Sequence, residues 1–466
     1  MAIVILTFTT PGGKYVYDRE TNSLLSVADD EFPAFQRVQE GTACEDDWVL
    51  LKRYTDNGYL KETCLTEIQH SMTPHMRHKL ENQISHLTLQ LSQRCNLRCS
   101  YCAFGSNNYE NQRTHASQSM PLEVIKKSVD FLMARSHGVG EVALGFYGGE
   151  PLLEIENFVA CVEYTKEAYK GRPVAYNITT NGTMLDDDIL RFIDENKINI
   201  AISFDGPKHL HDKNRVFADG SGSYDKIIAN VMYIKENYPD LYRRLNFITI
   251  VAPGVDYSCI NDFYTADEVL RESAVMSNSV SPFGAKEELL QYDDQYQVPF
   301  KFQMVKVLLA EIGLYSQDKV SRLFSPKFAS VITTYKGLSK YSIRNKSHPG
   351  GPCLPGVMRP FVNVYGNIFP CERVSEESDA MRIGHIDTGF EMDKVEAMLN
   401  VGKLTEAECI ACWNFIHCVL CVAACDGGTE LSSEKRLKEC VSAKGDTWEN
   451  IKTICWLLEN GYDFGD

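Results

Sequence analysis

The first part of the chain alternates short apolar runs with polar turns, which is typical of a small sheet followed by helices. Apolar residues at 3–8 and 14–18 flank the turn sequence Thr-Pro-Gly-Gly, and this arrangement predicts a β-hairpin. A third apolar run at 24–27 could add another strand. Helical patterns follow at 30–40 and at 45–57, where an Asn-Gly pair supplies a helix stop. We therefore expect a three-stranded sheet and two helices ahead of the rest of the chain.

From about residue 83 the pattern changes to strands that alternate with helices. Strands are expected at 86–92, 142–147, 174–180, 198–204, 245–252 and 274–282. Helices are expected among them at 122–134, 155–169, 187–196 and 224–237. This order predicts an α/β fold with a parallel sheet, right-handed crossovers and functional loops at the carboxyl ends of the strands. Residues 283–350 are mostly helical and carry no chemical signature.

Length and charge narrow the class of protein. The chain has 466 residues, too many for one compact core, so two or three domains are expected. Its net charge of −16 argues against a nucleic-acid partner, because a phosphate backbone calls for a cationic surface. No apolar run is long enough to cross a bilayer, and the apolar opening segment lacks the basic flank of a signal peptide. We therefore expect a cytoplasmic protein with no membrane partner.

The strongest chemical signal is a compact set of cysteines. Cys95, Cys99 and Cys102 read C-x3-C-x2-C, with Tyr101 before the last cysteine. Three thiolates this close together can hold three irons of a [4Fe–4S] cube and leave the fourth iron open to another ligand. The alternative is a zinc knuckle, although zinc usually takes four ligands from two separated pairs.

A second motif, Gly148-Gly149-Glu150-Pro151, follows the second strand expected after residue 83. Together with the three cysteines it resembles the radical S-adenosylmethionine (SAM) superfamily, whose open iron is chelated by the amino and carboxylate groups of SAM. The resemblance implies a partial (β/α)6 TIM-like barrel. It also implies a 5′-deoxyadenosyl radical that abstracts hydrogen from an unactivated C–H bond.

The same resemblance implies roles for single residues. Gly148 and Gly149 would let the backbone approach SAM, and the Glu150 carboxylate would accept from its ammonium group. The other cofactor-binding residues would be Tyr101 near the adenine, Ser203 at the ribose, Asn181 at the same mouth and Arg215 at the SAM carboxylate. Ser203, Asn181 and Arg215 could equally be polar residues that stabilise loops. His209 and His211 are expected to be solvated.

The C-terminal cysteines form the second constellation. Cys353, Gly366 and Cys371 resemble the C-x(9–15)-G-x4-C opening of the SPASM domain, and strand-like residues on both sides of Gly366 predict a hairpin. The remaining ligands would be Cys409, Cys412, Cys418, Cys421, Cys425 and Cys440, one cysteine more than the family pattern. We assign one auxiliary [4Fe–4S] cluster to Cys353, Cys371, Cys421 and Cys425, and the other to Cys409, Cys412, Cys418 and Cys440. Sequence order does not fix this partition, and two structural zinc sites are the alternative.

Other residues near these motifs are less informative. Glu372 follows Cys371 where sulfatase-maturing relatives carry an acidic candidate base, so it is the candidate catalytic residue. An exposed turn carboxylate is the alternative for Glu372. The five scattered cysteines are expected to be buried structural thiols: Cys44, Cys64, Cys161, Cys259 and Cys455.

These resemblances imply three domains. They are a winged-helix-like precursor peptide recognition domain at 1–82, a radical SAM partial barrel at 83–346 and a SPASM domain at 347–466. The first domain could instead be a structural cap. If the first domain recognises the precursor, a leader peptide would add as a strand to the sheet of this domain.

Enzymes with this combination mature ribosomally synthesised peptides, with an electron donor such as flavodoxin or ferredoxin. The leading hypothesis is a thioether crosslink between a cysteine sulfur and an acceptor carbon of the peptide. Carbon–carbon crosslinking and formylglycine formation of the sulfatase type remain alternatives. A non-catalytic iron–sulfur protein that binds peptides or transfers electrons would be a different class.

The cysteine pattern predicts the metal content. Protein purified without oxygen should contain about twelve irons per chain, because three cubes hold four irons each. An anaerobic iron and zinc determination checks this expectation. About four irons accompanied by two zinc ions would refute it.

Overall fold

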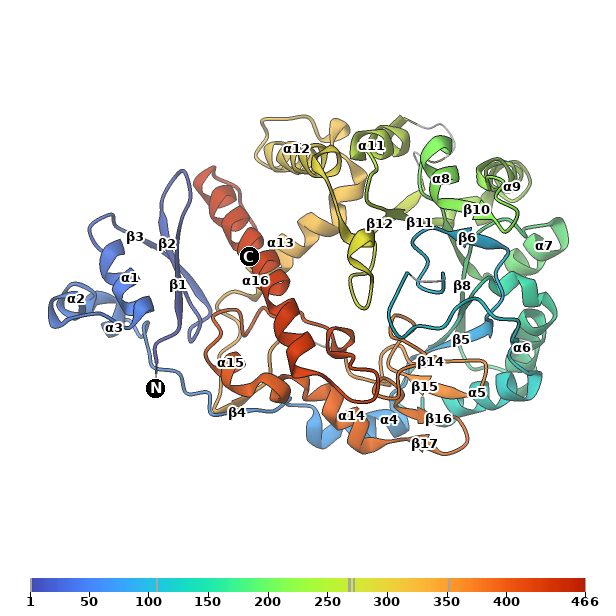
Figure 1. Ribbon diagram of the computed structural model, residues 1–466, viewed down its shortest axis with the longest axis horizontal. Coiled ribbons are helices and arrows are strands. Elements are labelled where there is room, and N and C mark those ends of the chain that lie inside the picture. Colours follow the sequence, from blue (N-terminus) through green and yellow to red (C-terminus); the bar gives the residue numbers. More distant parts are fainter. Residues whose placement is uncertain (1, 106–107, 267–269, 271–272, 351–352, 466) are drawn as a thin grey trace.

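The computed structural model describes all residues except 1, 106–107, 267–269, 271–272, 351–352 and 466. Figure 1 shows an N-terminal sheet with its helices at one end of the molecule and a curved sheet covered by helices at the other. The cysteine-rich C-terminal region lies between these two parts, and its long last helix, α16 (Ser433–Glu459), runs beside the N-terminal sheet. No helix in the described ranges is long and apolar enough to span a membrane.

The N-terminal part begins with the three antiparallel strands that the sequence predicts. They are β1 (Ile5–Thr9), β2 (Lys14–Asp18) and β3 (Ser23–Val27), in the order β1-β2-β3. The helices are α1 (Phe32–Glu40), α2 (Glu45–Leu50) and α3 (Lys52–Asp56). The single helix expected at 45–57 is therefore interrupted, because Leu51 leaves the helical conformation with a ψ of 6°.

Both faces of this small sheet are buried. Val16 packs with Phe35 of α1 on one face, and Tyr17 packs with Ile451 of α16 on the other. Val16 and Tyr17 are neighbours in β2 and pack on opposite faces because successive side chains of a strand point to opposite sides of the sheet. A short connection follows, with β4 (Glu67–Ile68) and α4 (Met76–Asn82), and β4 pairs with β13 (Lys346–Ser347).

The α/β class predicted for the next part is confirmed. Its six parallel strands are β5 (His86–Ser92), β7 (Val142–Gly148), β8 (Val174–Thr180), β9 (Asn199–Ser203), β11 (Asn246–Val251) and β12 (Ala274–Ser279). They are neighbours in the order β12-β11-β9-β8-β7-β5. The connecting helices are α5 (Leu122–Ala134), α6 (Ile155–Ala168), α7 (Asp187–Glu195), α8 (Lys208–Asn214), α9 (Tyr224–Asn237), α10 (Pro239–Arg243) and α11 (Tyr257–Ala266). A short antiparallel pair is formed by β6 (Leu97–Cys99) and β10 (Arg215–Phe217).

The two faces of the parallel sheet differ in chemistry. In β5, Leu87, Leu89 and Leu91 belong to the main apolar core, which the covering helices complete. The alternate residues Thr88 and Gln90 are polar, and both are buried. Because side chains alternate along a strand, the polar residues lie on the face away from the helices, where the candidate site is built.

The cysteine-rich region continues the same sheet. β14 (Phe361–Val362) pairs parallel to β5, and β15 (Asn367–Phe369) pairs antiparallel to β14. β16 (Gly384–His385) and β17 (Gly389–Phe390) complete a ten-stranded sheet. The hairpin predicted around Gly366 is therefore present, and it extends the parallel sheet rather than standing apart from it.

The remaining elements are helical, as expected for residues 283–350. The α-helices are α12 (Asp294–Glu311), α13 (Ser325–Gly337), α14 (Met392–Leu399) and α15 (Glu406–Ile410). Short 3-10 helices occur at Thr73–His75, Pro151–Glu154, Glu287–Leu290, Gln317–Lys319, Arg322–Phe324, Val401–Thr405 and Val422–Cys425. α13 packs against α16, so the segment that follows the parallel strands contacts the last helix of the C-terminal region.

Candidate active site and cysteine clusters

The cysteine loop at 95–102 begins at the carboxyl end of β5. Its middle part, Leu97–Cys99, forms β6, which pairs with β10 so that Cys99 lies opposite Arg215. The cysteine thiols are largely shielded, and burial raises the pKa of Cys95 to about 11 and that of Cys99 to about 12. Arg215 Nη1 lies 3.9 Å from Cys99 Sγ and adds a positive charge beside the loop.

These residues fit an iron–sulfur cluster. Three half-buried thiols without a carboxylate among them form a soft donor set, which suits iron–sulfur clusters or zinc. Ionised thiolates are costly to bury alone, and metal ions supply the compensating charge. Within the described residues, no three His, Cys, Asp or Glu side chains are placed to hold a single metal ion. A cube takes each thiolate on a separate iron, so its ligands need not converge on one point.

The two glycines of the Gly-Gly-Glu-Pro motif let the cysteine loop approach the end of β7. Gly149 N donates to Ser92 O at 2.7 Å, and Glu150 N donates to Arg94 O at 2.8 Å. A Cβ atom on Gly148 would lie 2.2 Å from Ser92 O, and one on Gly149 would lie 2.0 Å from Arg94 O. Gly148 also has a φ of +142°. The glycines therefore serve a backbone contact within the protein, a role that the sequence did not indicate.

Glu150 is fixed at the mouth of the barrel by three hydrogen bonds. Its Oε1 accepts from Thr180 Oγ1 at 2.7 Å and from Leu152 N at 3.0 Å, and its Oε2 accepts from Asn181 N at 2.7 Å. Burial raises the pKa of Glu150 to about 7, although these three donors favour the ionised form. The carboxylate is therefore preorganised, and a nearby cation would complete its ionisation.

The side chain of Asn181 forms hydrogen bonds to other residues of the protein. Its Nδ2 donates to Asn96 Oδ1 at 2.7 Å, and its Oδ1 accepts from the backbone and hydroxyl of Thr183. These bonds brace the cysteine loop from the end of β8. Ser203 is half-buried and ends β9.

A buried polar triad joins Tyr101, Asp205 and Arg215. Arg215 Nε donates to Asp205 Oδ2 at 2.9 Å, and the Tyr101 hydroxyl donates to the same oxygen. Burial opposes the charge of Arg215, but Asp205, Tyr101 and Cys99 together hold its pKa well above the ordinary value. Asp205 was missed in the sequence, although it stands in Ser-Phe-Asp-Gly-Pro after a predicted strand.

The expectation for the two histidines is half wrong. His209 is exposed, whereas His211 is fully buried against Asp205 and Ser223. His211 Nδ1 accepts from Asp205 N at 3.2 Å, and His211 Nε2 lies 2.9 Å from Ser223 Oγ. Burial lowers the pKa of His211 to about 4, so it is neutral and serves to position Asp205.

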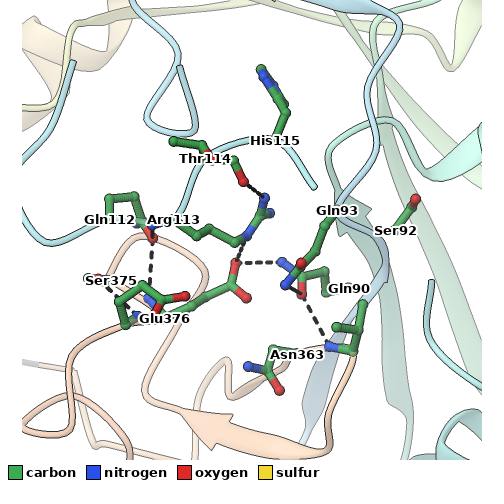
Figure 2. A network of polar contacts seen from close by, with 12 residues as sticks. Gln90, Ser92, Gln93, Gln112, Arg113, Thr114, His115, Asn363, Ser375 and Glu376 are labelled. Carbon is green, nitrogen blue, oxygen red and sulfur yellow. Dashed lines mark hydrogen bonds and ion pairs between the residues drawn. The ribbon is translucent and has the colours of Figure 1, made fainter. Parts of the chain in front are cut away.

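A buried ion pair fastens the barrel to the C-terminal region (Figure 2). Arg113 Nε lies 2.7 Å from a carboxylate oxygen of Glu376, with side chains only 5% and 3% exposed. Gln90 of β5 donates to the same oxygen, and the Arg113 guanidinium stacks 3.7 Å from the Phe104 ring centre. His115, two residues after Arg113, lies with Nε2 3.8 Å from Cys102 Sγ. The contact therefore ties the segment after Cys102 to the segment after Cys371.

The predicted candidate base, Glu372, lies beside Arg359. Its side chain is 6% exposed, so it is not the exposed turn carboxylate considered as the alternative. Both carboxylate oxygens accept hydrogen bonds from Arg359, one of them at 3.1 Å from Nε. Its role as a base stays a prediction.

The C-terminal cysteines fall into two neighbourhoods. In the first, Cys421 lies close enough to Cys371 and Cys353 for their thiols to interact with it electrostatically. Burial is the largest cause that raises the pKa of both Cys371 and Cys421. Cys425 is next to Cys421 but also interacts with Cys440, so it lies at the border of the two groups.

The second neighbourhood lies around Cys409. Cys412 interacts with Cys409 and Cys440, and Cys418 interacts with Cys412 and Cys409. Apart from Cys425, these interactions lie within the predicted sets, and the ligand sets themselves stay a prediction.

Of the five scattered cysteines, the structure buries two fully, Cys161 and Cys455. Cys259 is partly buried. The expectation is wrong for Cys44 and Cys64, which are exposed. Cys44 stands at the N-terminal cap of α2, where its Sγ lies 3.4 Å from Asp47 Oδ2.

Known proteins resemble one part of this chain most clearly. Residues 89–266 match the Radical SAM superfamily. A cysteine-type anaerobic sulfatase-maturating enzyme of Clostridium novyi is 35% identical over 173 residues, which are 36% of this chain and 44% of that protein. A serine-type anaerobic sulfatase-maturating enzyme of Bacteroides thetaiotaomicron is 31% identical over 146 residues, 31% of this chain and 34% of that protein. The matched segment thus spans less than half the length of these relatives.

Two further similarities extend the comparison. The radical SAM cyclopropyl synthase TigE of Paramaledivibacter caminithermalis is 23% identical over 202 residues, 40% of this chain and 41% of that protein. The solved structure of native anSMEcpe with bound AdoMet superposes with a TM-score of 0.55 at 21% identity. It covers 79% of this chain and 98% of that one, so the two proteins share a fold.

Replacing Gly149 with alanine should displace the cysteine loop, because the added Cβ would collide with the Arg94 carbonyl. We expect Gly149→Ala to lose about four irons per chain and to keep the others. Gly140→Ala is the matched control, since a Cβ there meets nothing within 4 Å. Anaerobic iron determination on both variants measures the effect. A Gly149→Ala protein with full iron content would contradict the role of this contact.

Proposed function

Because residues 89–266 are a radical SAM domain, homologous to that of the anaerobic sulfatase-maturating enzymes, we propose that this protein modifies a ribosomally synthesised precursor peptide. The preferred reaction is a thioether crosslink between a peptide cysteine sulfur and an acceptor carbon. One observation carries the proposal: the domain is joined in one chain to a sheet with an open edge and to eight further cysteines beside the barrel.

The cofactors of the radical SAM family are SAM and a [4Fe–4S] cluster, and we assign their site here to the carboxyl ends of β5, β7 and β8. Cys95, Cys99 and Cys102 would hold the cluster. When bound, these cofactors supply hydrogen-atom abstraction from an unactivated C–H bond. The chain's own residues would bind SAM and orient it. Glu150, held by three donors, would receive the ammonium group, and Arg215, already charged and buried, would face the carboxylate.

The N-terminal sheet is the proposed leader site. β3 pairs with β2 on one side, and no strand in the described part of the chain pairs with its other side. Both faces of the sheet are already covered, by α1 and α16. An extended peptide would therefore find its free hydrogen-bonding groups along the outer edge of β3.

The C-terminal cysteines are the proposed ligands of two auxiliary [4Fe–4S] clusters. Closing a thioether bond by this route removes two hydrogens from the peptide, and the second electron needs an acceptor. The C-terminal cysteines would hold clusters that supply an acceptor for that electron, and an electron donor such as flavodoxin or ferredoxin would supply the electron that SAM cleavage consumes. Glu372, buried beside Cys371, is the proposed proton acceptor.

Formylglycine formation is the second candidate, because two of the similar proteins are sulfatase-maturating enzymes of the cysteine and serine types. In that reaction the substrate cysteine or serine becomes an aldehyde. It does not require a leader site, so leader dependence separates the two. Carbon–carbon crosslinking would share the leader and the barrel and differ only in the bond formed.

Mass spectrometry of a co-expressed cysteine-rich precursor tests the function. A thioether product should lose two hydrogens per bond and leave those thiols resistant to alkylation, and a precursor without its leader should stay unmodified. The matched control is the triple variant Cys95→Ala, Cys99→Ala and Cys102→Ala, which should cleave no SAM. Loss of two hydrogens with every thiol alkylatable would favour a carbon–carbon bond. An aldehyde product independent of the leader would favour formylglycine.

Binding of SAM should depend on pH through Glu150. The pKa of its buried carboxyl is about 7, and an ammonium group beside it favours the ionised form, so binding releases a proton below that pH. Affinity for SAM should therefore rise from pH 6 to pH 8, by at most about tenfold per pH unit.

Equilibrium dialysis of SAM against the anaerobic, iron-loaded protein measures this dependence. Glu150→Gln should weaken binding and remove the slope between pH 6 and pH 8. The exposed residue Glu156 lies six positions further on. Glu156→Gln should leave the affinity for SAM and its pH dependence unchanged. Wild-type affinity in Glu150→Gln would exclude the proposed contact.

A further inference from the structure

Arg436 is a fully buried cation in the first turn of α16. Its side chain is among the largest that the molecule shields from solvent, with 1% exposed. Its Nε donates to Thr405 Oγ1 at 3.1 Å, and its Nη1 donates to Cys425 Sγ, 3.9 Å away. Thr405 Oγ1 in turn lies 3.3 Å from Cys409 Sγ. One guanidinium therefore reaches a cysteine of each neighbourhood, the first directly and the second through a threonine.

The charges around Arg436 come from thiols. Burial by itself would lower the pKa of Arg436, but Cys425, Cys409 and Cys418 raise it above the ordinary value. Cys440 stands one helical turn further along α16, and its thiol also interacts with the guanidinium. Arg436 thus touches both proposed ligand sets.

No carboxylate compensates this cation. In the part of the chain that the structure describes, no Asp or Glu forms an ion pair with Arg436, and its hydrogen-bond acceptors are a hydroxyl and a sulfur. By contrast Arg19, which is also fully buried, is paired with Glu20. A buried guanidinium without a counter-charge is strongly unfavourable. The negative charge that balances Arg436 must therefore come from the cysteine groups.

We propose that Arg436 is the shared counter-cation of the two auxiliary clusters and that it raises the reduction potential of both. The inference rests on the auxiliary clusters of the proposed function. A one-electron reduction adds one negative charge to a cluster, so a fixed cation beside it favours the reduced state, as does an N–H donor on a ligand sulfur. Arg436 is then a tuning residue, which makes the auxiliary clusters better electron acceptors.

The test replaces the charge and keeps the bulk. In Arg436→Met, a redox titration with dithionite followed by electron paramagnetic resonance should find both auxiliary clusters at more negative potentials. The cluster at Cys95, Cys99 and Cys102 should keep its potential. Arg436→Lys, which retains the charge, should stay closer to wild type than Arg436→Met. The control Lys438→Met, at an exposed position of the same helix, should change nothing.

Every outcome decides the role of the charge. Wild-type auxiliary potentials in Arg436→Met would overturn the proposal. If Arg436→Met loses the auxiliary irons, their retention in Arg436→Lys supports it, and an equal loss in both variants overturns it. About four irons in the wild-type protein would instead defeat the auxiliary clusters themselves. About twelve irons with unchanged potentials would defeat only the role of Arg436.

Discussion

The whole site depends on a close backbone contact between the cysteine loop and the ends of the parallel strands. Gly149 N donates to Ser92 O, and Glu150 N donates to Arg94 O. A Cβ atom would have no space at Gly148 or at Gly149. The contact holds the loop over the barrel and places the Glu150 carboxylate beside it. Since Thr180 and Asn181 then bind that carboxylate, three strand ends are locked together by one short motif. The backbone contact fixes the loop, and the three hydrogen bonds fix the Glu150 side chain.

A second constraint joins the barrel to the cysteine-rich region. β14 pairs with β5, the strand that leads into the cysteine loop. The loop at 95–102 and the C-terminal cysteine region are therefore connected to neighbouring strands. The buried ion pair of Arg113 and Glu376 is a second connection between the two parts (Figure 2). Removing one partner of a buried pair leaves an uncompensated charge, which is strongly destabilising. The strand pairing and the ion pair together connect the two parts.

The sequence predicted those features that depend on local pattern. The strands at 86–92 and 174–180 lie where alternation and apolar runs place them, and the hairpin around Gly366 follows from its turn. Features that depend on distant contacts were not predictable. His211 is buried against Asp205 and Ser223, and Arg436 is buried against Thr405 and Cys425, which lie 31 and 11 residues before it. No spacing rule reports such neighbours, since each arises only when the chain has folded.

The long helix α16 links the N-terminal sheet to the cysteine-rich region (Figure 1). Its first turns carry Arg436 and Cys440, and its last turns pack Ile451 and Cys455 against the N-terminal sheet. At 1.5 Å per residue its 27 residues span about 40 Å. Glu459 at its end binds Tyr15 of β2, so the sheet cannot rotate without breaking that contact. A peptide bound along β3 would thus start from a fixed distance to the cysteine groups, and the length of chain between its leader and its reacting residue would decide which residues arrive at the barrel.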